Sequence, residues 1–309
     1  MPSLLGDGVV ALISGFDDEG AGGGMFRYDG RNVGQLDGLP CTGLAVENGV
    51  LARVLRGSEA ASRASLLLHD SESNVTDVAV DELVDPHDIL WTGDSYAIAC
   101  AGANKIVFVS PAGVVTRVWE APGAGDAWHL NSLLLVDGEL HLSAFGKFER
   151  HREWAEPGAN PASGFVLNLA TGRDVVTGLS SPHHPRLVDG QWIVCNSGRR
   201  ALTLIDAETG RIEAEVVLDG WTRGLAVLDG GLLVGESPGR TEPKGVSASV
   251  AFVDRGTWEV AGRFSVPTRG IYDIVLAPSE LALSVRRSAR RAKVRRTLLL
   301  PKPGPAVDP

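Results

Sequence analysis

Six positions in this chain place a polar side chain directly before a short apolar run. They are Thr42, His87, Asn131, His183, Arg223 and Tyr272. The intervals between them are 45, 44, 52, 40 and 49 residues, and each is followed by an apolar run and a turn. A plain scaffold would need only Gly, Ser, Thr or Val at such places. These residue types therefore predict one functional site assembled from six segments.

Further candidates accompany these positions. Asp88, His184 and Asp273 each come one residue later, so His184 occupies the place that the two aspartates hold in their own segments. Trp128 and His129 precede Asn131, while Asn196 and Glu236 end the next apolar run of their segments. We predict catalytic roles for His184, Tyr272, Asp273 and Asp88. We predict substrate-binding roles for Arg223, Asn131, Thr42, Asn196, Glu236 and Trp128.

Three kinds of chemistry suit such a set. In the first, a divalent metal is held by His87, His129 and either His183 or His184, with Asn131, Asp273 or Glu236 completing its shell, because imidazole suits Zn, Mn, Fe, Ni or Cu. In the second there is no metal, and a histidine oriented by Asp88 or Asp273 acts as a general base while Arg223 binds an anionic substrate. In the third, the side chains form a polar plug bridged by waters, without chemistry.

The elements that position these residues are predicted from the repeat. Each unit contains about four short strands separated by turns, as in "LTLIDAETGRIEAEVVLDG", and no window has a convincing 3.6-residue apolar stripe. Four short strands in a unit of this length are typical of a β-propeller blade. The first strand of every blade lines a central channel. The six polar positions are therefore expected to converge on one mouth of that channel.

The number of blades follows from how the ends are used. We expect an all-β propeller that forms one domain over residues 1–309, with six four-stranded antiparallel blades. N-terminal strands within "GMFRYDG" and "NVGQLDG" would complete the last blade, which leaves no exposed sheet edge. Seven blades are the alternative, if "LLGDGVVALISG" forms a separate strand pair. Residues 146–164 form one long insertion, interpreted as either a lid or a solvated loop.

Net charge and hydropathy limit the classes of partner that this chain is expected to bind. A net charge of −9 and a pI near 5.3 argue against a nucleic-acid surface, and no apolar run is long enough to span a membrane. The segment 286–296 has seven basic residues in eleven and is interpreted as a solvated terminal segment or an anion-binding rim.

Cys41, Cys100 and Cys195 lack CxxC spacing and favour buried thiols in the cytoplasm. The first residues lack the basic and apolar pattern of a secretory signal, so we expect none, and no nucleotide-binding motif occurs. The oligomeric state is expected to be a monomer or a small homo-oligomer.

The motifs HDI, WHLN, SPHHPR, TRGL and YDI, in this order, resemble an uncharacterised bacterial β-propeller family known as a domain of unknown function. The resemblance covers roughly residues 41–278, and its matching positions are His87, Asp88, His129, Asn131, His183, Arg186, Arg223, Tyr272 and Asp273. His184 stands where that family usually has a small residue. More distant likenesses are to six-bladed lactonases, strictosidine-synthase-like enzymes and oligogalacturonate lyases. The last of these hold manganese with histidines and act on an acidic sugar.

The expected function combines these observations. We expect an enzyme that binds a small anionic metabolite at the channel mouth and acts through a divalent metal, which could be Mn, Zn, Fe, Ni or Ca. Lyase, isomerase or cyclase chemistry is favoured over lactone hydrolysis, within natural-product or sugar-acid metabolism. The alternative is a non-catalytic propeller that serves as a ligand sensor or a protein-docking scaffold.

Overall fold

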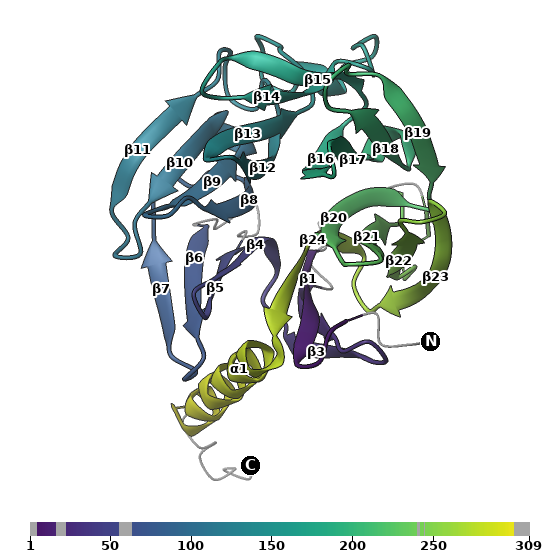
Figure 1. Ribbon diagram of the computed structural model, residues 1–309. Coiled ribbons are helices and arrows are strands. Elements are labelled where there is room, and N and C mark those ends of the chain that lie inside the picture. The colour runs from purple at the N-terminus through teal and green to yellow at the C-terminus, as the bar shows by residue number, and fades with distance from the viewer. Residues whose placement is uncertain (1–4, 17–22, 56–63, 240–241, 244, 300–309) are drawn as a thin grey trace, which may run out of the picture.

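The computed structural model describes residues 5–16, 23–55, 64–239, 242–243 and 245–299, and side chains to residue 289. Figure 1 shows six four-stranded sheets arranged as a ring around an axis, which is a six-bladed β-propeller. The prediction of six blades is confirmed. The sheets are numbered here as blades 1 to 6 in order around the ring.

Blade 1 combines both ends of the chain, and blades 2 and 3 follow it. Blade 1 has the order β24 (Gly270–Pro278), β1 (Val9–Phe16), β2 (Gly24–Tyr28), β3 (Val33–Asp37). Blade 2 has β4 (Cys41–Glu47), β5 (Val50–Leu55), β6 (Ser65–Asp70), β7 (Val75–Ala79). Blade 3 has β8 (Pro86–Trp91), β9 (Tyr96–Cys100), β10 (Lys105–Val109), β11 (Val115–Glu120).

The remaining blades are continuous in sequence. Blade 4 has β12 (Leu130–Val136), β13 (Glu139–Ala144), β14 (Gly164–Asn168), β15 (Arg173–Leu179). Blade 5 has β16 (Pro182–Val188), β17 (Gln191–Asn196), β18 (Ala201–Asp206), β19 (Ile212–Val217). Blade 6 has β20 (Trp221–Val227), β21 (Gly231–Ser237), β22 (Ala248–Asp254), β23 (Glu259–Val266). Short 3-10 turns η1 (Ala101–Ala103), η2 (Glu153–Ala155) and η3 (Ser197–Arg199) lie in the connections.

The hydrophobic core is divided among the joints between blades. In the described residues, six buried clusters each combine side chains of neighbouring sheets, for example Ile98 of β9 with Val54 of β5. Strands that alternate inward and outward side chains bury one face against each neighbouring blade, which removes apolar surface from water around the whole ring. Cys41, Cys100 and Cys195 are buried free thiols, and burial raises the pKa of each to about 12.

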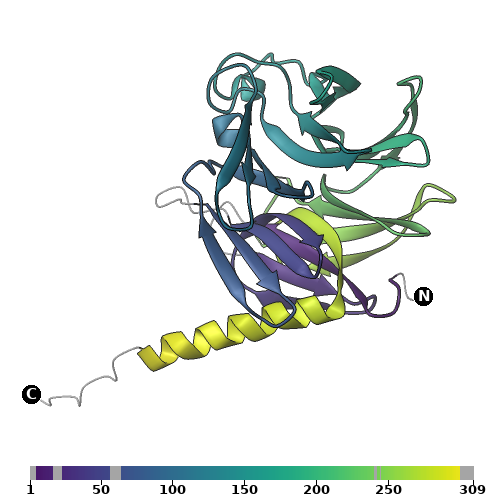
Figure 2. The same cartoon turned by 60° about the vertical axis from the view of Figure 1, so that its left-hand side comes forward.

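A helix follows the last strand, contrary to the expectation from the sequence. α1 (Ser279–Leu299) packs Leu281, Ala282 and Val285 into the cluster between blades 1 and 2. Figure 2 shows its C-terminal end pointing away from the sheets. The apolar stripe was missed because it occupies only the first two turns and is followed by the basic segment. Side chains of that segment beyond residue 289 lie outside the description. Within the described ranges, no helix is both long and apolar enough to cross a bilayer.

The inner strands share one irregularity that shapes the channel. In each blade the pairing between the first two strands shifts register close to the predicted polar position, for example between Pro86 and Asp88 or between His183 and Arg186. Such bulges bend a strand and re-aim its side chains. The repeat in the sequence therefore marks a repeated bulge at the channel.

Candidate functional site

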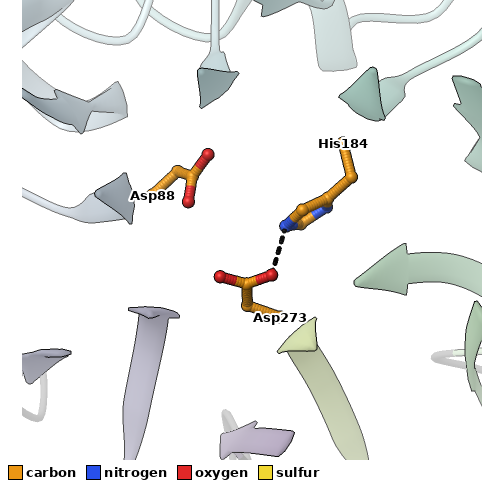
Figure 3. Close-up of side chains that lie close together, drawn as sticks. All are labelled: Asp88, His184 and Asp273. Atoms are coloured by element: carbon orange, nitrogen blue, oxygen red, sulfur yellow. Dashed lines mark ion pairs between the residues drawn. The ribbon is translucent and has the colours of Figure 1, made fainter. Parts of the chain in front are cut away.

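The residues directly after the six polar positions meet at the axis in an alternating pattern. The odd-numbered blades contribute Asp273, Asp88 and His184, and the even-numbered blades contribute Gly43, Ser132 and Gly224. A Cβ on Gly43 would lie 2.6 Å from the Cα of Asp88, and one on Gly224 would lie 3.0 Å from the carbonyl carbon of Asp273. The two glycines therefore leave the space in which the aspartate-bearing strands approach. Figure 3 shows the three large side chains pointing toward one another.

Each axial side chain bonds the backbone of the next blade. The carboxylate of Asp88 accepts from Leu133 N at 2.7 Å, and that of Asp273 accepts from Leu44 N at 2.9 Å. His184 Nδ1 accepts from Gly224 N at 3.2 Å, and its Nε2 lies 3.2 Å from Asp273 Oδ1. These contacts join inner strands that are distant in sequence.

The charges of this axial triad (Asp88, His184, Asp273) are unequal. Burial and the negative charge of Asp273 raise the pKa of Asp88 to about 6. Burial also acts to raise the pKa of Asp273, but His184, the charge of Arg186 and the Leu44 N–H together outweigh it and leave that pKa below its ordinary value. Asp273 is therefore the ionised partner of His184, while Asp88 is the carboxyl group that takes up a proton more readily.

The axial triad could hold a metal by distance alone. Among the described residues, it is the group of three whose ligand atoms all lie within 4.8 Å of one another. However, a ring nitrogen that accepts a backbone N–H leaves the proton of a neutral imidazole on the other nitrogen. His184 Nε2 therefore carries a proton in the ring's neutral form, and metal ligation there would require the Gly224 bond to be given up. The arrangement suits a proton-holding network better than a metal centre.

The mouth of the channel presents three other histidines. His87 Nδ1 lies 3.1 Å from Asn131 Oδ1, and the amide nitrogen of Asn131 donates to His129 O, which fixes the orientation of that amide. His129 Nδ1 lies 2.8 Å from Asp126 Oδ1. His183 Nδ1 lies 3.0 Å from Ser181 O. Amide and carbonyl oxygens accept, so Nδ1 is the donor in the His87 and His183 rings, and it is the donor in the His129 ring when Asp126 is ionised. In each case Nε2 of the neutral form keeps its lone pair.

The environment keeps two of these rings neutral. Burial, with a smaller contribution from the charge of His87, lowers the pKa of His129 well below its ordinary value. Burial and the charge of Arg223 do the same for His183. Burial raises the pKa of Asp126 to about 7, although the charge of His87 partly opposes this. The mouth therefore combines unprotonated imidazoles with a guanidinium group.

Aromatic side chains form the wall around the histidines. The ring centroids of His87 and His129 are 5.0 Å apart, and Trp154 of the insertion lies 4.2 Å from His129. Phe145 contacts both His129, with ring centroids 4.3 Å apart, and His183, with ring centroids 5.5 Å apart. The His87 and His129 rings therefore contact each other directly, and Phe145 links His129 to His183.

The insertion is docked at the mouth. Trp154 Nε1 and Arg152 N both donate to Asp126 O, and Ala124 N donates to Glu149 O. These bonds hold it against the loop that carries Asp126. Of the two interpretations of this segment, the contacts favour a covering element over a loop that only meets solvent.

Other predicted residues are placed as follows. Arg223 stacks on Tyr272 with its guanidinium carbon 4.3 Å from the ring centroid. Thr42 Oγ1 donates to Pro86 O, Asn196 Nδ2 donates to Thr203 Oγ1, and Glu236 pairs with Arg263 at 3.0 Å. Trp128 packs against Trp119 and Phe165. Substrate contacts for Thr42, Asn196, Glu236 and Trp128 stay predictions.

The sequence interpretation missed three residues at the mouth. Asp85 lies 3.5 Å from His87 Nε2, Asp126 contacts His129, and Trp221 packs 6.3 Å from the His183 ring. Each precedes a predicted residue by two or three positions in sequence. An acidic residue shortly before each of the first two histidines was the available signal.

Comparisons with known proteins agree with the fold. A chain of a nidogen/laminin complex aligns with a TM-score of 0.66 at 14% identity, covering 87% of this chain and 98% of the other. A protein of unknown function from Bacteroides caccae gives 0.60 at 14% identity, covering 86% and 98%. A luciferin-regenerating enzyme gives 0.54 at 14% identity, covering 75% and 78%. Identities this low establish the fold alone.

Sequence comparison identifies a family but no characterised relative. The family model described as "Domain of unknown function (DUF4915)" matches residues 75–255. No curated protein matches the chain. The matched region contains the three mouth histidines, Asp88 and Arg223.

Proposed function

Because the chain belongs to the family of domain of unknown function DUF4915, its activity must be inferred from its own channel mouth, and we propose that it is an enzyme acting there on a small anionic metabolite. A divalent metal would be held by His87, His129 and Asp85. His183, assigned to the same metal-binding set from sequence, packs against Phe145 and Trp221 and is proposed to face the substrate instead.

The observation that carries this proposal is the hydrogen bonding of the histidines. A metal-binding histidine usually donates its second ring N–H to a carboxylate, an amide or a carbonyl oxygen, which orients the ring. His87 and His129 both have such a partner at Nδ1. Metal binding also needs neutral imidazole, and the lowered pKa of His129 supplies it.

The spacing of the donor atoms is compatible with an ion on the His87 side. His87 Nε2 and Asp85 Oδ1 are 3.5 Å apart, a separation expected for two ligands of one ion that are each about 2.1 Å from it in tetrahedral geometry. His129 does not complete a set within 4.8 Å in the described residues. Binding would therefore draw its ring inward.

The remaining residues suggest what the site would do. A bound divalent ion would polarise a carbonyl or carboxylate oxygen and stabilise negative charge on it. Arg223 would pair with a substrate carboxylate, and Tyr272, beneath the guanidinium, would transfer a proton. Removal of a proton next to a carboxylate underlies many lyase, isomerase and cyclase reactions, so we favour these over lactone hydrolysis.

Metal analysis of untagged protein tests the proposal. We expect about one divalent ion per chain, as for a single catalytic site. His87→Ala and His129→Ala should weaken binding of added Mn²⁺ or Zn²⁺ in calorimetry by at least about tenfold, as loss of a ligand does. His141→Ala is the matched control, because His141 lies in β13 and bonds Asn168.

Unchanged metal content in both mouth variants would contradict the proposed ligands. A failure both to contain metal and to bind added metal would contradict metal-dependent chemistry. It would favour the ligand-sensing or docking alternative.

A further inference from the structure

Three buried polar atoms near the mouth have no hydrogen-bond partner within the part of the chain that the structure describes. They are His183 Nε2, Trp221 Nε1 and Arg223 Nε. The His183 side chain is almost fully buried, with 3% of its surface exposed. A buried polar atom without a partner is unfavourable, so three in one region indicate groups that are satisfied by a ligand.

The three atoms differ in what they offer. Trp221 Nε1 and Arg223 Nε each carry a hydrogen and can only donate. His183 Nδ1 donates to Ser181 O at 3.0 Å and also lies 2.8 Å from Ser197 Oγ, whose own proton goes to Thr222 O. His183 Nε2 of the neutral ring can therefore only accept. The group presents two donors, one of them cationic, and one acceptor.

The side chains lie near one another. Trp221 and Arg223 are two residues apart on β20, which places them on the same face of the strand. The rings of His183 and Trp221 are 6.3 Å apart, and the charge of Arg223 acts on His183. Phe145 and Tyr272 border the same region, at 5.5 Å from the His183 ring and 4.3 Å from the Arg223 guanidinium.

We propose that His183, Trp221 and Arg223 form a subsite for a 2-hydroxycarboxylate. The carboxylate accepts from Arg223 and Trp221, and the neighbouring hydroxyl donates to His183 Nε2. A phosphate dianion fits less well, because it would bring only acceptor oxygens to the His183 lone pair. The aromatic wall favours an apolar or aromatic substituent on the same carbon. This subsite deepens the proposed function and rests on the channel mouth being the substrate site.

A matched set of three probes separates the two recognition elements. Mandelate has the carboxylate and the hydroxyl, phenylacetate lacks the hydroxyl, and mandelamide lacks the charge. In wild-type protein we expect mandelate to bind at least about tenfold more tightly than either analogue, measured by ligand-observed NMR or calorimetry. Equal binding of mandelate and phenylacetate, or no binding of any probe, would overturn the subsite.

Two variants test whether His183 recognises the hydroxyl and Arg223 recognises the carboxylate. His183→Asn keeps a donor at the Nδ1 position and removes the Nε2 acceptor, so mandelate binding should fall to the phenylacetate level while phenylacetate binding is unchanged. Arg223→Met keeps the apolar stem, so mandelate binding should fall to the mandelamide level. His141→Asn serves as the control, and thermal unfolding verifies that each variant is folded. Unchanged mandelate binding in His183→Asn would overturn the assignment.

The outcomes for the two proposals differ. Failure of all three probes with about one ion still bound through His87 and His129 would overturn the subsite and leave the metal proposal standing. Mandelate binding in protein that binds no metal would support the subsite and overturn the metal proposal.

Discussion

The adjacent residues His183 and His184 carry the proton of their neutral rings on different nitrogens. His183 Nδ1 donates to a carbonyl, which leaves its Nε2 as an acceptor. His184 Nδ1 accepts from a backbone N–H, which leaves the proton of its neutral ring on Nε2, beside Asp273. His184 also adopts a positive φ of 44°, a backbone conformation that costs a residue other than glycine about 1–3 kcal/mol. Its bond to Gly224 of blade 6 and its contact with Asp273 of blade 1 offset that cost.

The first prediction concerns this axial bond. His184→Ala should lower the free energy of unfolding by roughly 1–3 kcal/mol, because Gly224 N–H loses its acceptor in a buried place. His184→Asn should recover part of the loss, because the Asn oxygen can accept that N–H and Asn tolerates positive φ. Urea unfolding measures both variants. Equal stability of the Ala and Asn variants would contradict a role for the bond.

At the scale of elements, the sequence repeat was sufficient to locate every inner strand. Thr42, His87, Asn131, His183, Arg223 and Tyr272 lie in β4, β8, β12, β16, β20 and β24. The repeat could not predict which side chains pair across different strands. Glu236 pairs with Arg263, which is 27 residues later and on a different strand of the blade. The short apolar stripe of α1 could be interpreted only from the structure, in which it packs into the hydrophobic cluster between blades 1 and 2.

A buried ion pair, with a histidine hydrogen-bonded to it, connects blades 1 and 2 away from the mouth. Arg53 of β5 is 1% exposed, pairs with Asp37 of β3 at 2.7 Å and donates its Nε–H to His69 Nε2 at 3.1 Å. Burial, with the charge of Arg53, lowers the pKa of His69 to about 4. The native state therefore holds His69 neutral at a pH where an unfolded chain would protonate it.

The second prediction is a pH dependence from this residue. Between about pH 6.5 and pH 4 the unfolded chain binds the extra proton, so stability falls as pH decreases through that window. The contribution of His69 is on the order of 3 kcal/mol. In His69→Gln the amide oxygen still accepts from Arg53 but does not titrate, so stability should fall less on acidification. Parallel unfolding curves for both proteins over this pH range would contradict the assignment.

At the scale of the whole molecule, the ring closes without a covalent connection in blade 1. β24 comes from the C-terminal part of the chain and pairs with β1 from the N-terminal part, as expected from the sequence. Ser14 sits at this seam, where its Oγ accepts from Asp273 N at 2.9 Å and donates to Thr42 O. One hydroxyl therefore joins both chain ends to blade 2. Ser197 has a comparable role between blades 5 and 6, where it donates to Thr222 O.

The third prediction compares these two serines. Ser14→Ala and Ser197→Ala should each lower the free energy of unfolding by roughly 1–3 kcal/mol, since each leaves buried polar groups unpaired. Their effects on local opening should differ, because only blade 1 can separate its strands without straining a turn between them. Hydrogen exchange of β1 and β24 amides should therefore accelerate in Ser14→Ala, while β16 and β17 amides in Ser197→Ala stay protected up to global unfolding. Equal local acceleration at both joints would show that the seam is no weaker than a blade closed by hairpins.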